Sequence, residues 1–580
     1  MNSGHRLQPV RVTTSRPEGP TEPNTQREQH LARLHAETFD LAIIGGGITG
    51  AAVARDAAMR GLRTAMIDKG DFACATSSHS SKLIHGGLRY LAQGQLRLVY
   101  HALRERERLR HVTAPHLVHP LKFLFPFYRG RHPSRTAVCA GLILYDLFAR
   151  TPPGEKHRRL GPNEVHRCEP ALEPEGLAGG AIYLDATGDD ARMTLENVLD
   201  AAYHGAAVAN YVAVEGFAHA GQRVAALFAR DVESGAPFEL RARVFVNAAG
   251  PWVEQIRRLD EQGCGPLVRL TKGVHLVIES SYLPVRNSLV LTDDRNRIIF
   301  LIRHGNYILV GTTDTNFEGS CEDVCANLED TEYLLHIINQ SVPDARLSQR
   351  HIAVCFAGLR TLRISHQLQP SSATREELIV VSRSGLITVA GGKLTMHREI
   401  ASHVVDRVMK ILGRSYERSP TLAEPLPGAR GGPQTSGLMS ELPPELHQAL
   451  IARYGSRAEF VARIAAERVE LAQPLALDSP AIRAEVIHAV RNEFARTLAD
   501  FIARRTAMTW RAPAAVLASA LQVARLMAQE LGWDTERECR ELHSFVDHLN
   551  RIRHHAIVHQ DGFFGENVSA YSPPLVEGGN

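Results

Sequence analysis

"FDLAIIGGGITGAAVARDAAMRGLRTAMIDKG", Phe39 to Gly70, is the stretch that decides the fold of this chain. It begins with a short apolar segment, Asp40 to Ile44, which is typical of a buried parallel strand. A helical segment from Ile48 to Arg60 follows, and a second apolar segment, Thr64 to Ile67, completes the unit. The order predicts a βαβ unit in an α/β fold.

Three glycines in GxGxxG spacing join the first strand to the helix. In a dinucleotide-binding loop, Gly45 would permit a tight turn, Gly47 would admit a pyrophosphate, and Gly50 would let the helix pack closely on the strand. Asp68 ends the second strand, where a carboxylate can accept hydrogen bonds from a ribose diol. The alternative is an ordinary βαβ turn with incidental glycines, but the helix, second strand and terminal acid together favour a dinucleotide site.

Length and composition constrain the domain number, the partners and the compartment of the chain. The chain has 580 residues, enough for two or three domains, and its net charge of +3 indicates no general preference for nucleic acid. Its eight cysteines form no disulfide framework and favour a reducing compartment. Cys321 and Cys325 are the only close pair, and we expect no metal site there. We expect neither a secretory signal nor a membrane-spanning helix.

Alternation of strand and helix patterns predicts a discontinuous nucleotide domain. We assign it to residues 39–100, 191–261 and 356–423, and a strand-rich cap domain to residues 101–190 and 262–355. A Pro- and Gly-rich linker, 424–439, leads to a helical C-terminal domain, 440–560, and a tail, 561–580. We expect residues 1–38 to be a disordered extension.

Six motifs occur in an order that resembles one family: "IIGGGITGAAVARDAAMRGL", "ATSSHSSKLIHGGLRYL", "VNAAGPW", "KGVHLVI", "VGTTD" and "AGGKLT". They resemble the FAD-dependent glycerol-3-phosphate dehydrogenases, from about Phe39 to Met508. The resemblance implies a glutathione-reductase-like FAD domain with an inserted α+β substrate-capping domain and a helical C-terminal domain. It also implies oxidation of sn-glycerol 3-phosphate to dihydroxyacetone phosphate by hydride transfer to flavin N5, with electrons passed to a membrane quinone.

The resemblance makes FAD the expected nucleotide. Hydroxyl groups in the Ser-rich stretch suit diphosphate and flavin oxygens, and small residues at a strand end would admit a flat ring system, although a solvated loop and an ordinary tight turn are the plain alternatives. The expected cofactor-binding residues are Gly45, Gly47, Gly50, Asp68, Thr76, Ser77, Ser78, Ser81, His85, Ala249, Gly250, Gly392, Lys393 and Leu394.

The substrate carries a phosphate, for which arginine is well suited because its planar fork makes two parallel charge-assisted bonds. Lys393 follows two glycines at a helix start, a favourable place for an anion. By resemblance, the substrate-binding residues are Arg89, Tyr90, His275, Arg360, Lys393 and Thr395. Each arginine taken alone would more often be a surface charge.

His275 is the candidate catalytic base, because imidazole accepts a proton near neutral pH. A histidine satisfied within the cap sheet is the alternative, and Arg360 could instead stabilise the developing alkoxide. The chain departs from the family after Arg360, where Thr361 replaces the usual proline and predicts a less rigid loop. Met396 and His397 also depart from the usual pair after "GGKLT".

Residues His101 to Leu160 contain twelve Arg or Lys against four Asp or Glu, interleaved with apolar and aromatic segments. This pattern suits an anionic membrane surface, although a solvated basic face is the alternative. Together with the resemblance, it favours a cytoplasmic enzyme that is peripheral on the cytoplasmic face of the inner membrane, and it leaves a homodimer open. An oxygen-reducing oxidase, a related hydroxy- or amino-acid oxidoreductase and a scaffold without turnover are the other readings.

Overall fold

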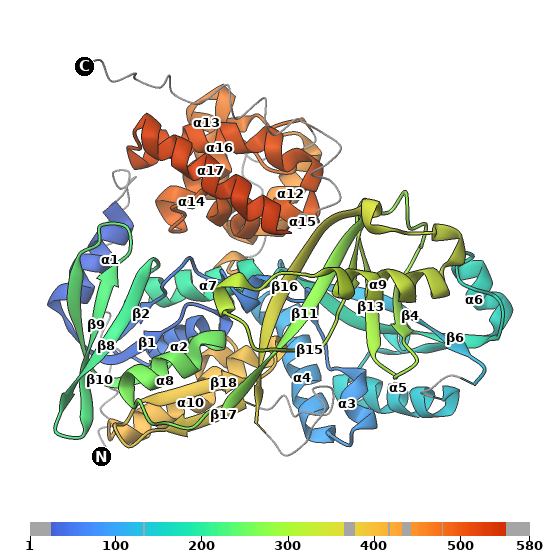
Figure 1. The fold of residues 1–580 in the computed structure, drawn as a ribbon, viewed down its shortest axis with the longest axis horizontal. Coiled ribbons are helices and arrows are strands. Elements are labelled where there is room, and N and C mark those ends of the chain that lie inside the picture. Colours follow the sequence, from blue (N-terminus) through green and yellow to red (C-terminus); the bar gives the residue numbers. More distant parts are fainter. Residues whose placement is uncertain are drawn as a thin grey trace, which may run out of the picture.

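The computed structural model describes residues 25–130, 134–364, 377–415, 418–431, 442–477 and 479–552. Figure 1 shows two sheets lying side by side, with a group of helices above them. The first sheet carries the GxGxxG unit, and the second is built from the two insertions, the short strand Leu83–Ile84 and a strand that continues to Arg363. The assignment of residues 39–100 to the nucleotide domain is therefore wrong for Leu83–Ile84, which pair with the cap sheet. The helices above come from the C-terminal part of the chain.

The first sheet has a parallel centre in which β1 pairs with both β2 and β10. Its strands follow the order β17-β18-β10-β1-β2-β7, and β8 and β9 extend it beside β10. All but the first residue of β1 are buried, as expected for a central parallel strand. The strands are β1 (Thr38–Ile44), β2 (Thr64–Ile67), β7 (Ala207–Ala209), β8 (Val212–Ala220), β9 (Arg223–Asp231), β10 (Pro237–Asn247), β17 (Glu377–Val381) and β18 (Ile387–Gly391).

Three helices share one hydrophobic cluster with the central strands of this sheet: α2 (Ile48–Met59), α7 (Asp190–Tyr203) and α10 (His397–Ile411). A second cluster joins the central strands to β9 and to the helix α1 (Thr25–Ala36). The short helix α8 (Val253–Asp260) follows β10. The central strands are therefore enclosed on two sides, which explains their continuous apolar sequences.

The prediction of disorder for residues 1–38 is wrong for residues 25–36, which form α1. Arg27 in this helix is buried and forms an ion pair with Asp231 at 2.6 Å. Its guanidinium also donates to the carbonyl of Asn210 at 2.8 Å. Local composition gave no sign of these partners, which lie 183 and 204 residues further along the chain. Residues 1–24 lie outside the described residues.

The second sheet follows the order β15-β11-β14-β13-β12-β4-β6-β3, with β16 beside β11 and β5 beside β6. Its strands are β3 (Leu83–Ile84), β4 (Val118–Tyr128), β5 (Arg158–Leu160), β6 (Leu177–Gly188), β11 (Val268–Glu279), β12 (Ser288–Thr292), β13 (Ile298–His304), β14 (Tyr307–Gly311), β15 (Thr315–Phe317) and β16 (Ile352–Arg363). The helices of this part are α3 (Leu88–Ala92), α4 (Leu96–Arg108), α5 (Arg135–Ala149), α6 (Pro162–Cys168) and α9 (Leu328–Ser341).

The predicted return to the nucleotide domain at residue 356 is wrong. Strand β16 pairs antiparallel with β11 through most of its length, from Val268 opposite Arg363 to Ile278 opposite Ile352. The cap sheet therefore extends to Arg363. Both β11 and β16 lie beside the first sheet, so side chains from this pair can reach the dinucleotide loop.

The C-terminal domain is helical and has its own core. Its helices are α12 (Pro444–Tyr454), α13 (Ala458–Glu467), α14 (Arg483–Asn492), α15 (Met508–Arg511), α16 (Val516–Leu531) and α17 (Thr535–Ile552). The predicted tail, 561–580, lies outside the described residues. Within the described part of the chain, we find no helix that combines the length and apolar character needed to cross a membrane.

Candidate active site

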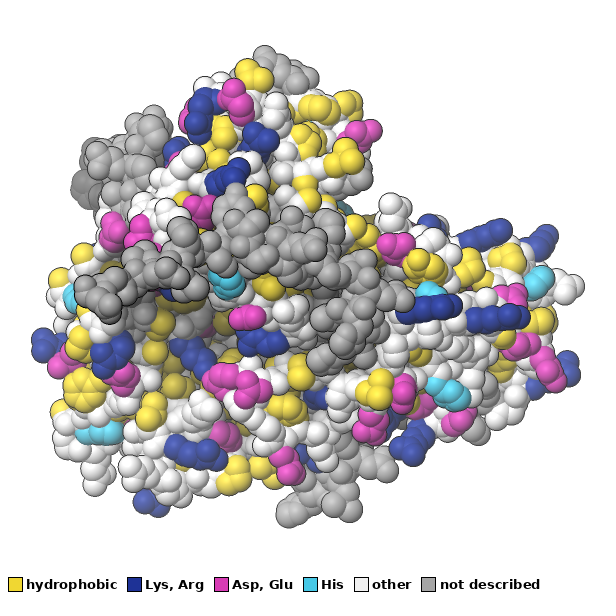
Figure 2. Space-filling model, turned by 45° about the horizontal axis from the view of Figure 1, so that its top comes forward, with side chains coloured by type: hydrophobic (Ala, Val, Ile, Leu, Met, Phe, Trp, Pro, Cys, Tyr) yellow, Lys and Arg dark blue, Asp and Glu magenta, His cyan; other side chains and the backbone are white. Residues whose placement is uncertain are grey.

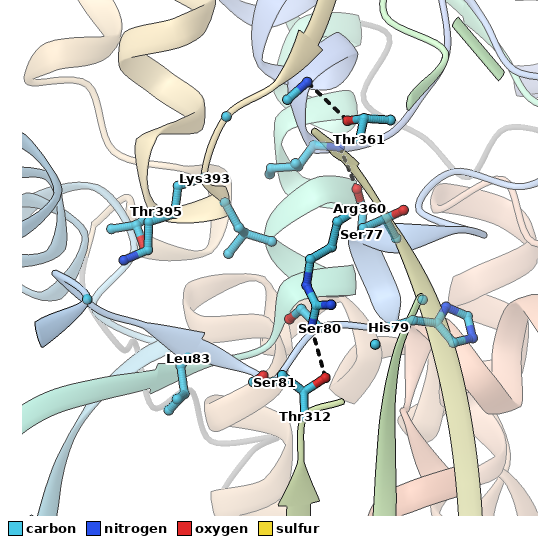
Figure 3. A pocket seen from close by; sticks show the side chains of 18 of the residues that line it. Ser77, His79, Ser80, Ser81, Leu83, Thr312, Arg360, Thr361, Lys393 and Thr395 are labelled. Atoms are coloured by element: carbon cyan, nitrogen blue, oxygen red, sulfur yellow. Dashed lines mark hydrogen bonds between the residues drawn. The ribbon is translucent and has the colours of Figure 1, made fainter. Parts of the chain in front are cut away.

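One cavity of about 290 Å³ opens where the two sheets meet. Its walls come from many separate segments, among them the dinucleotide loop, the Ser-rich stretch and the paired strands β11 and β16. Figure 3 shows Arg360 extending from β16 into this space, with Lys393 and Thr395 on another side. The predicted site residues that line it are Gly47, Thr76, Ser77, Ser81, His85, Arg89, Tyr90, Gly250, His275, Arg360, Gly392, Lys393, Leu394 and Thr395.

The three glycines of the dinucleotide loop have different surroundings. Gly45 adopts a φ of +109°, in the region that favours glycine. A Cβ atom on Gly50 would lie 1.8 Å from the carbonyl oxygen of Gly45, so only glycine permits this approach of helix to strand. At Gly47 a Cβ atom would meet only the Ser77 hydroxyl, at 3.2 Å. Gly45 and Gly50 thus shape the loop, while Gly47 faces the cavity.

The Ser-rich stretch crosses the floor of the site and is anchored on both sides. The Ser77 hydroxyl accepts a hydrogen bond from the Ile48 amide at 2.9 Å, at the start of α2. The Thr76 hydroxyl donates to the carbonyl of Leu359 at 2.6 Å, which ties the stretch to β16. Ser78 was predicted to contact the cofactor, but it does not line this cavity, and its hydroxyl donates to the carbonyl of Ala75 at 3.2 Å.

Asp68 lies at the end of β2, as predicted, but outside the cavity lining. Its carboxylate accepts hydrogen bonds from the amides of Gly46 at 2.6 Å and Gly70 at 2.9 Å. Burial raises the pKa of this carboxyl group to about 6. Its contact with a ribose stays a prediction, as does that of Ala249, which also lies outside the lining.

Arg360 is held in place by residues of the "VGTTD" motif. Its guanidinium donates to the Thr312 hydroxyl at 2.8 Å and to the Thr313 carbonyl at 3.2 Å, and it forms an ion pair with Asp314 at 3.3 Å. Because several donors of the fork are occupied on one side, the orientation of the group toward the cavity is fixed. Thr312 was not among the predicted site residues, although it lines the cavity.

The predicted loosening at Thr361 is wrong. Thr361 lies within β16, opposite Leu270 of β11, and not in a loop. Its hydroxyl accepts a hydrogen bond from the Gly391 amide at 3.0 Å, which Figure 3 marks with a dashed line. This contact ties the second sheet to the end of β18, and a proline side chain has no hydroxyl to make it.

Lys393 approaches the same cavity from the loop after β18. It is buried, and its ammonium donates to the carbonyl of His85. The Thr395 hydroxyl accepts from the His85 amide at 3.2 Å, so the two segments hold each other. Arg89, on α3, and Tyr90 complete this side, with the Lys393 ammonium 5.5 Å from the centre of the Tyr90 ring.

His275 lies in the lining of the cavity and is buried. Its Nε2 is 2.8 Å from the Ser81 hydroxyl, and its ring stacks on Phe356 at a centroid distance of 5.1 Å. Burial, together with the positive charge of Arg360, lowers the pKa of His275 well below its usual value. The lowered pKa favours the neutral imidazole, which has a ring nitrogen free of a proton but is a weaker base than an exposed histidine.

Two glycines make room for these side chains, and the sequence reasoning missed both. A Cβ atom on Gly273 would lie 2.2 Å from a guanidinium nitrogen of Arg360, and one on Gly311 would lie 2.2 Å from Cδ2 of His275. Both glycines sit in the quoted motifs "KGVHLVI" and "VGTTD". The motifs therefore contain both glycines, but the role of each depends on which strands lie side by side, because that arrangement places the glycine next to the side chain that it accommodates.

These residues fit a flavin dinucleotide. Gly47 leaves its side of the cavity open, and the first amides of α2 adjoin it. A helix N-terminus of this kind favours phosphate groups. Small residues at Ala248 and Gly250, together with Gly391 and Gly392, line the adjoining wall and leave space for a flat ring system.

Comparison with known proteins bears on the class of protein to which this chain belongs. A family model described as "FAD dependent oxidoreductase" matches residues 40–398, and one described as "C-terminal domain of alpha-glycerophosphate oxidase" matches residues 419–538. The "Aerobic glycerol-3-phosphate dehydrogenase" of Bacillus subtilis is 33% identical over 92% of this chain and 98% of its own length. The "Glycerol-3-phosphate dehydrogenase" of Mycobacterium leprae is 36% identical over 90% of this chain and 89% of its own.

A solved structure of similar overall shape is the glycerol-3-phosphate dehydrogenase of Bacillus halodurans complexed with FAD. It has a TM-score of 0.76 and 29% identity, covering 91% of this chain and 98% of that one. The fold and site thus define a flavin-dependent oxidoreductase with an added helical domain. Within that class, the chain belongs to the FAD-dependent glycerol-3-phosphate dehydrogenase family, and its cofactor is FAD. The predicted fold class, family and cofactor are confirmed.

We predict that Gly47→Val yields a folded protein without FAD. The new side chain would meet only the Ser77 hydroxyl within the protein, but it would occupy the space where the pyrophosphate is expected. Flavin absorbance per protein and the melting temperature of the apoprotein would be measured, with Gly154→Ala, whose Cβ meets nothing within 4 Å, as the control. A Gly47→Val protein with full FAD content would contradict this placement.

Proposed function

We propose that the protein oxidises sn-glycerol 3-phosphate to dihydroxyacetone phosphate and passes the electrons to a membrane quinone. The observation that carries the proposal is the convergence of Arg89, Arg360 and Lys393 on one cavity that also borders Gly47. Three cationic groups from separate segments suit a phosphate dianion. The names of the relatives support the same substrate.

In this proposal one group of residues binds the phosphate, and a different residue accepts the proton of the reacting alcohol. Arg360, Lys393 and Arg89 bind the phosphate, and the contacts of Arg360 with Thr312 and Thr313 keep its fork oriented. Bound FAD supplies the two-electron acceptor. His275 accepts the proton of the substrate hydroxyl at Nε2, the nitrogen that Ser81 also contacts.

The basic insertion contributes less free positive charge than its composition indicates. Arg106 is buried in an ion pair with Asp185 at 2.9 Å, and Arg110 pairs with Glu107 at 3.1 Å. These arginines stabilise the interior of the cap domain. Lys122, Arg129 and Arg135 are exposed, and Arg131 lies outside the described residues.

An exposed apolar surface lies on the same part of the chain. On α5 the side chains of Ile143, Leu144 and Leu147 are 51%, 38% and 67% exposed. On the neighbouring helix α4, Leu96 and Tyr100 are 48% and 40% exposed, and Tyr100 meets Phe148 of α5 edge to face. We refer to Leu96, Tyr100, Ile143, Leu144 and Leu147 as the apolar face.

We propose that the apolar face enters the outer part of the cytoplasmic leaflet, with the enzyme attached peripherally. Exposed basic residues at both ends of α5, Arg135 and Arg150, would lie near anionic headgroups. Among the coloured residues on the face drawn in Figure 2, acidic and basic side chains are interspersed. A homodimer is compatible with this arrangement.

An oxidase that reduces oxygen is the second candidate. The C-terminal domain matches a family model named after alpha-glycerophosphate oxidase. The same site would serve either acceptor, since substrate oxidation precedes reoxidation of the cofactor. The exposed apolar face favours the quinone, because a membrane acceptor requires contact with the bilayer.

We predict that Arg360→Ala and Lys393→Ala each lower kcat/KM for glycerol 3-phosphate about ten- to a hundredfold and leave FAD bound. Loss of one charge-assisted contact costs about 1.5–3 kcal/mol. Gly273→Ala should reproduce the Arg360→Ala defect, because its Cβ would displace the guanidinium. Arg241→Ala, at an exposed pair with Glu239, is the control. Unchanged kinetics in both charge variants would remove these residues from the site.

We predict that His275→Asn lowers kcat about 10²- to 10⁴-fold, the range for loss of a general base, with FAD content unchanged. Since burial lowers the pKa of His275 well below 6.5, the neutral base persists as pH falls through 6.5. The pH profile of kcat/KM should therefore show no His275-dependent break near 6.5. The phosphate of the substrate ionises near pH ~6 and gives the same limb in both proteins. A break near 6.5 in the wild type that His275→Asn lacks would contradict the lowered pKa.

We predict that the double variant Leu144→Ser, Leu147→Ser is released from anionic liposomes and loses quinone reduction. Burial of one leucine is worth about 1.5–3 kcal/mol, so binding should fall at least tenfold. Activity with a soluble dye should persist, because the substrate cavity lies elsewhere. Val469→Ser, Leu477→Ser, at exposed apolar residues of the C-terminal domain, is the matched control. If the wild-type protein does not bind these liposomes at low salt and turns over with oxygen alone, the result would favour the oxidase function.

A further inference from the structure

The segment that joins β2 to the cavity, residues 68–77, shapes the dinucleotide loop. At its start the Asp68 carboxylate accepts a hydrogen bond from the amide of Gly46 at 2.6 Å. At its end the Ser77 hydroxyl accepts from the amide of Ile48 at 2.9 Å. Both amides belong to the loop and helix start where the pyrophosphate of FAD is expected. Displacement of this segment would therefore disturb the FAD site directly.

The middle of the segment is held by the C-terminal domain. Asp71 is buried, and Arg505 binds its carboxylate with two parallel bonds of 2.6 and 2.8 Å. Arg504 adds a third bond from Nε at 2.5 Å. Both arginines lie on the helical turn Asp500–Arg505 of the C-terminal domain, more than 430 residues from Asp71. Bidentate, charge-assisted pairs of this kind fix geometry as well as contribute energy.

An aromatic contact next to Asp71 continues the connection to the loop. The Phe72 ring lies under Gly46, where a Cβ atom would come within 2.5 Å of it. On its other side Phe72 meets Phe494 of the C-terminal domain edge to face, at a centroid distance of 5.7 Å. Asn210 binds both partners, donating to the Asp71 carboxylate at 3.1 Å and to the Phe494 carbonyl at 2.8 Å. The C-terminal domain thus reaches Gly46 of the loop through the Phe72 ring, in addition to its contacts with Asp71.

The two domains have other contacts that do not touch this segment. Arg192 and Glu493 form a fully buried ion pair at 2.7 Å. Arg496 and Glu233 form another at 2.8 Å, near the surface. These pairs can keep the domains together when the Asp71 contacts are lost. Docking of the C-terminal domain and support of the dinucleotide loop are therefore separable by mutation.

We propose that the C-terminal domain retains FAD, with Arg504, Arg505 and Phe494 as positioning residues that act through Asp71 and Phe72 on the dinucleotide loop. The inference depends on FAD as cofactor and not on the identity of the substrate. It gives the helical domain a role in the cofactor site, although none of its residues lines the main cavity.

The test measures release of FAD without substrate. In Asp71→Asn and in Arg505→Lys, the rate of FAD dissociation, followed by recovery of flavin fluorescence after dilution, should rise at least tenfold over wild type. Excess FAD should restore the flavin spectrum and a wild-type KM for glycerol 3-phosphate. Arg496→Gln, which breaks an inter-domain pair that involves neither Asp71 nor Phe72, should release FAD at the wild-type rate.

Phe494→Leu provides a second arm, because it leaves every inter-domain ion pair intact and should fold even if the charge variants do not. It should also release FAD faster than Arg496→Gln. The proposal is overturned if the folded Asp71 or Phe494 variants release FAD at the wild-type rate. It is equally overturned if they only lower the melting temperature of the apoprotein. Since substrate is absent, either outcome leaves the proposed reaction untouched.

Discussion

The backbone contact between Gly45 and Gly50 is the constraint on which the rest of the site depends. It seats the start of α2 directly on the end of β1, at a distance that no side chain would allow. Because the helix begins there, its N-terminus lies beside Gly47 at the cavity, and the Ile48 amide is held by the Ser77 hydroxyl. The Ser-rich stretch, the end of β10 and the loop after β18 then gather around this point.

The second sheet supplies the side chains that we propose bind the substrate and accept its proton, next to that nucleotide site. Paired strands β11 and β16 place His275 and Arg360 on one wall, and glycines at 273 and 311 leave the space that each side chain occupies. Thr361 and Thr76 fasten this wall to the nucleotide domain through hydrogen bonds to Gly391 and Leu359. Burial, together with the neighbouring charge of Arg360, lowers the pKa of His275, while the Thr312 and Thr313 contacts orient the Arg360 guanidinium.

Buried ion pairs determine the position of the C-terminal domain against the FAD domain. The pairs of Arg192 with Glu493 and of Arg505 with Asp71 are nearly or completely inaccessible to solvent. Desolvation of such groups is costly, so a misplaced domain would leave a buried charge without its partner. The same geometry that specifies docking also places Phe494 behind Phe72, beneath the dinucleotide loop. Stability of the interface and integrity of the cofactor site are therefore connected.

The sequence alone determined the parts whose cause is local. The βαβ unit follows from apolar periodicity and from glycine geometry, and the confirmed fold class and cofactor follow from that unit with the quoted motifs. Tertiary structure decided what depends on distant partners. Strand β16 joins the cap sheet because β11 pairs with it, Arg106 is interior because Asp185 meets it, and α1 is ordered because Asp231 receives Arg27. Ser78 does not line the cavity, because its hydroxyl donates to the nearby Ala75 carbonyl, whereas its neighbour Ser77 lines it. Composition and spacing describe a residue's own segment, whereas strand partners, buried ion pairs and the direction of a side chain depend on contacts that only the folded chain brings together.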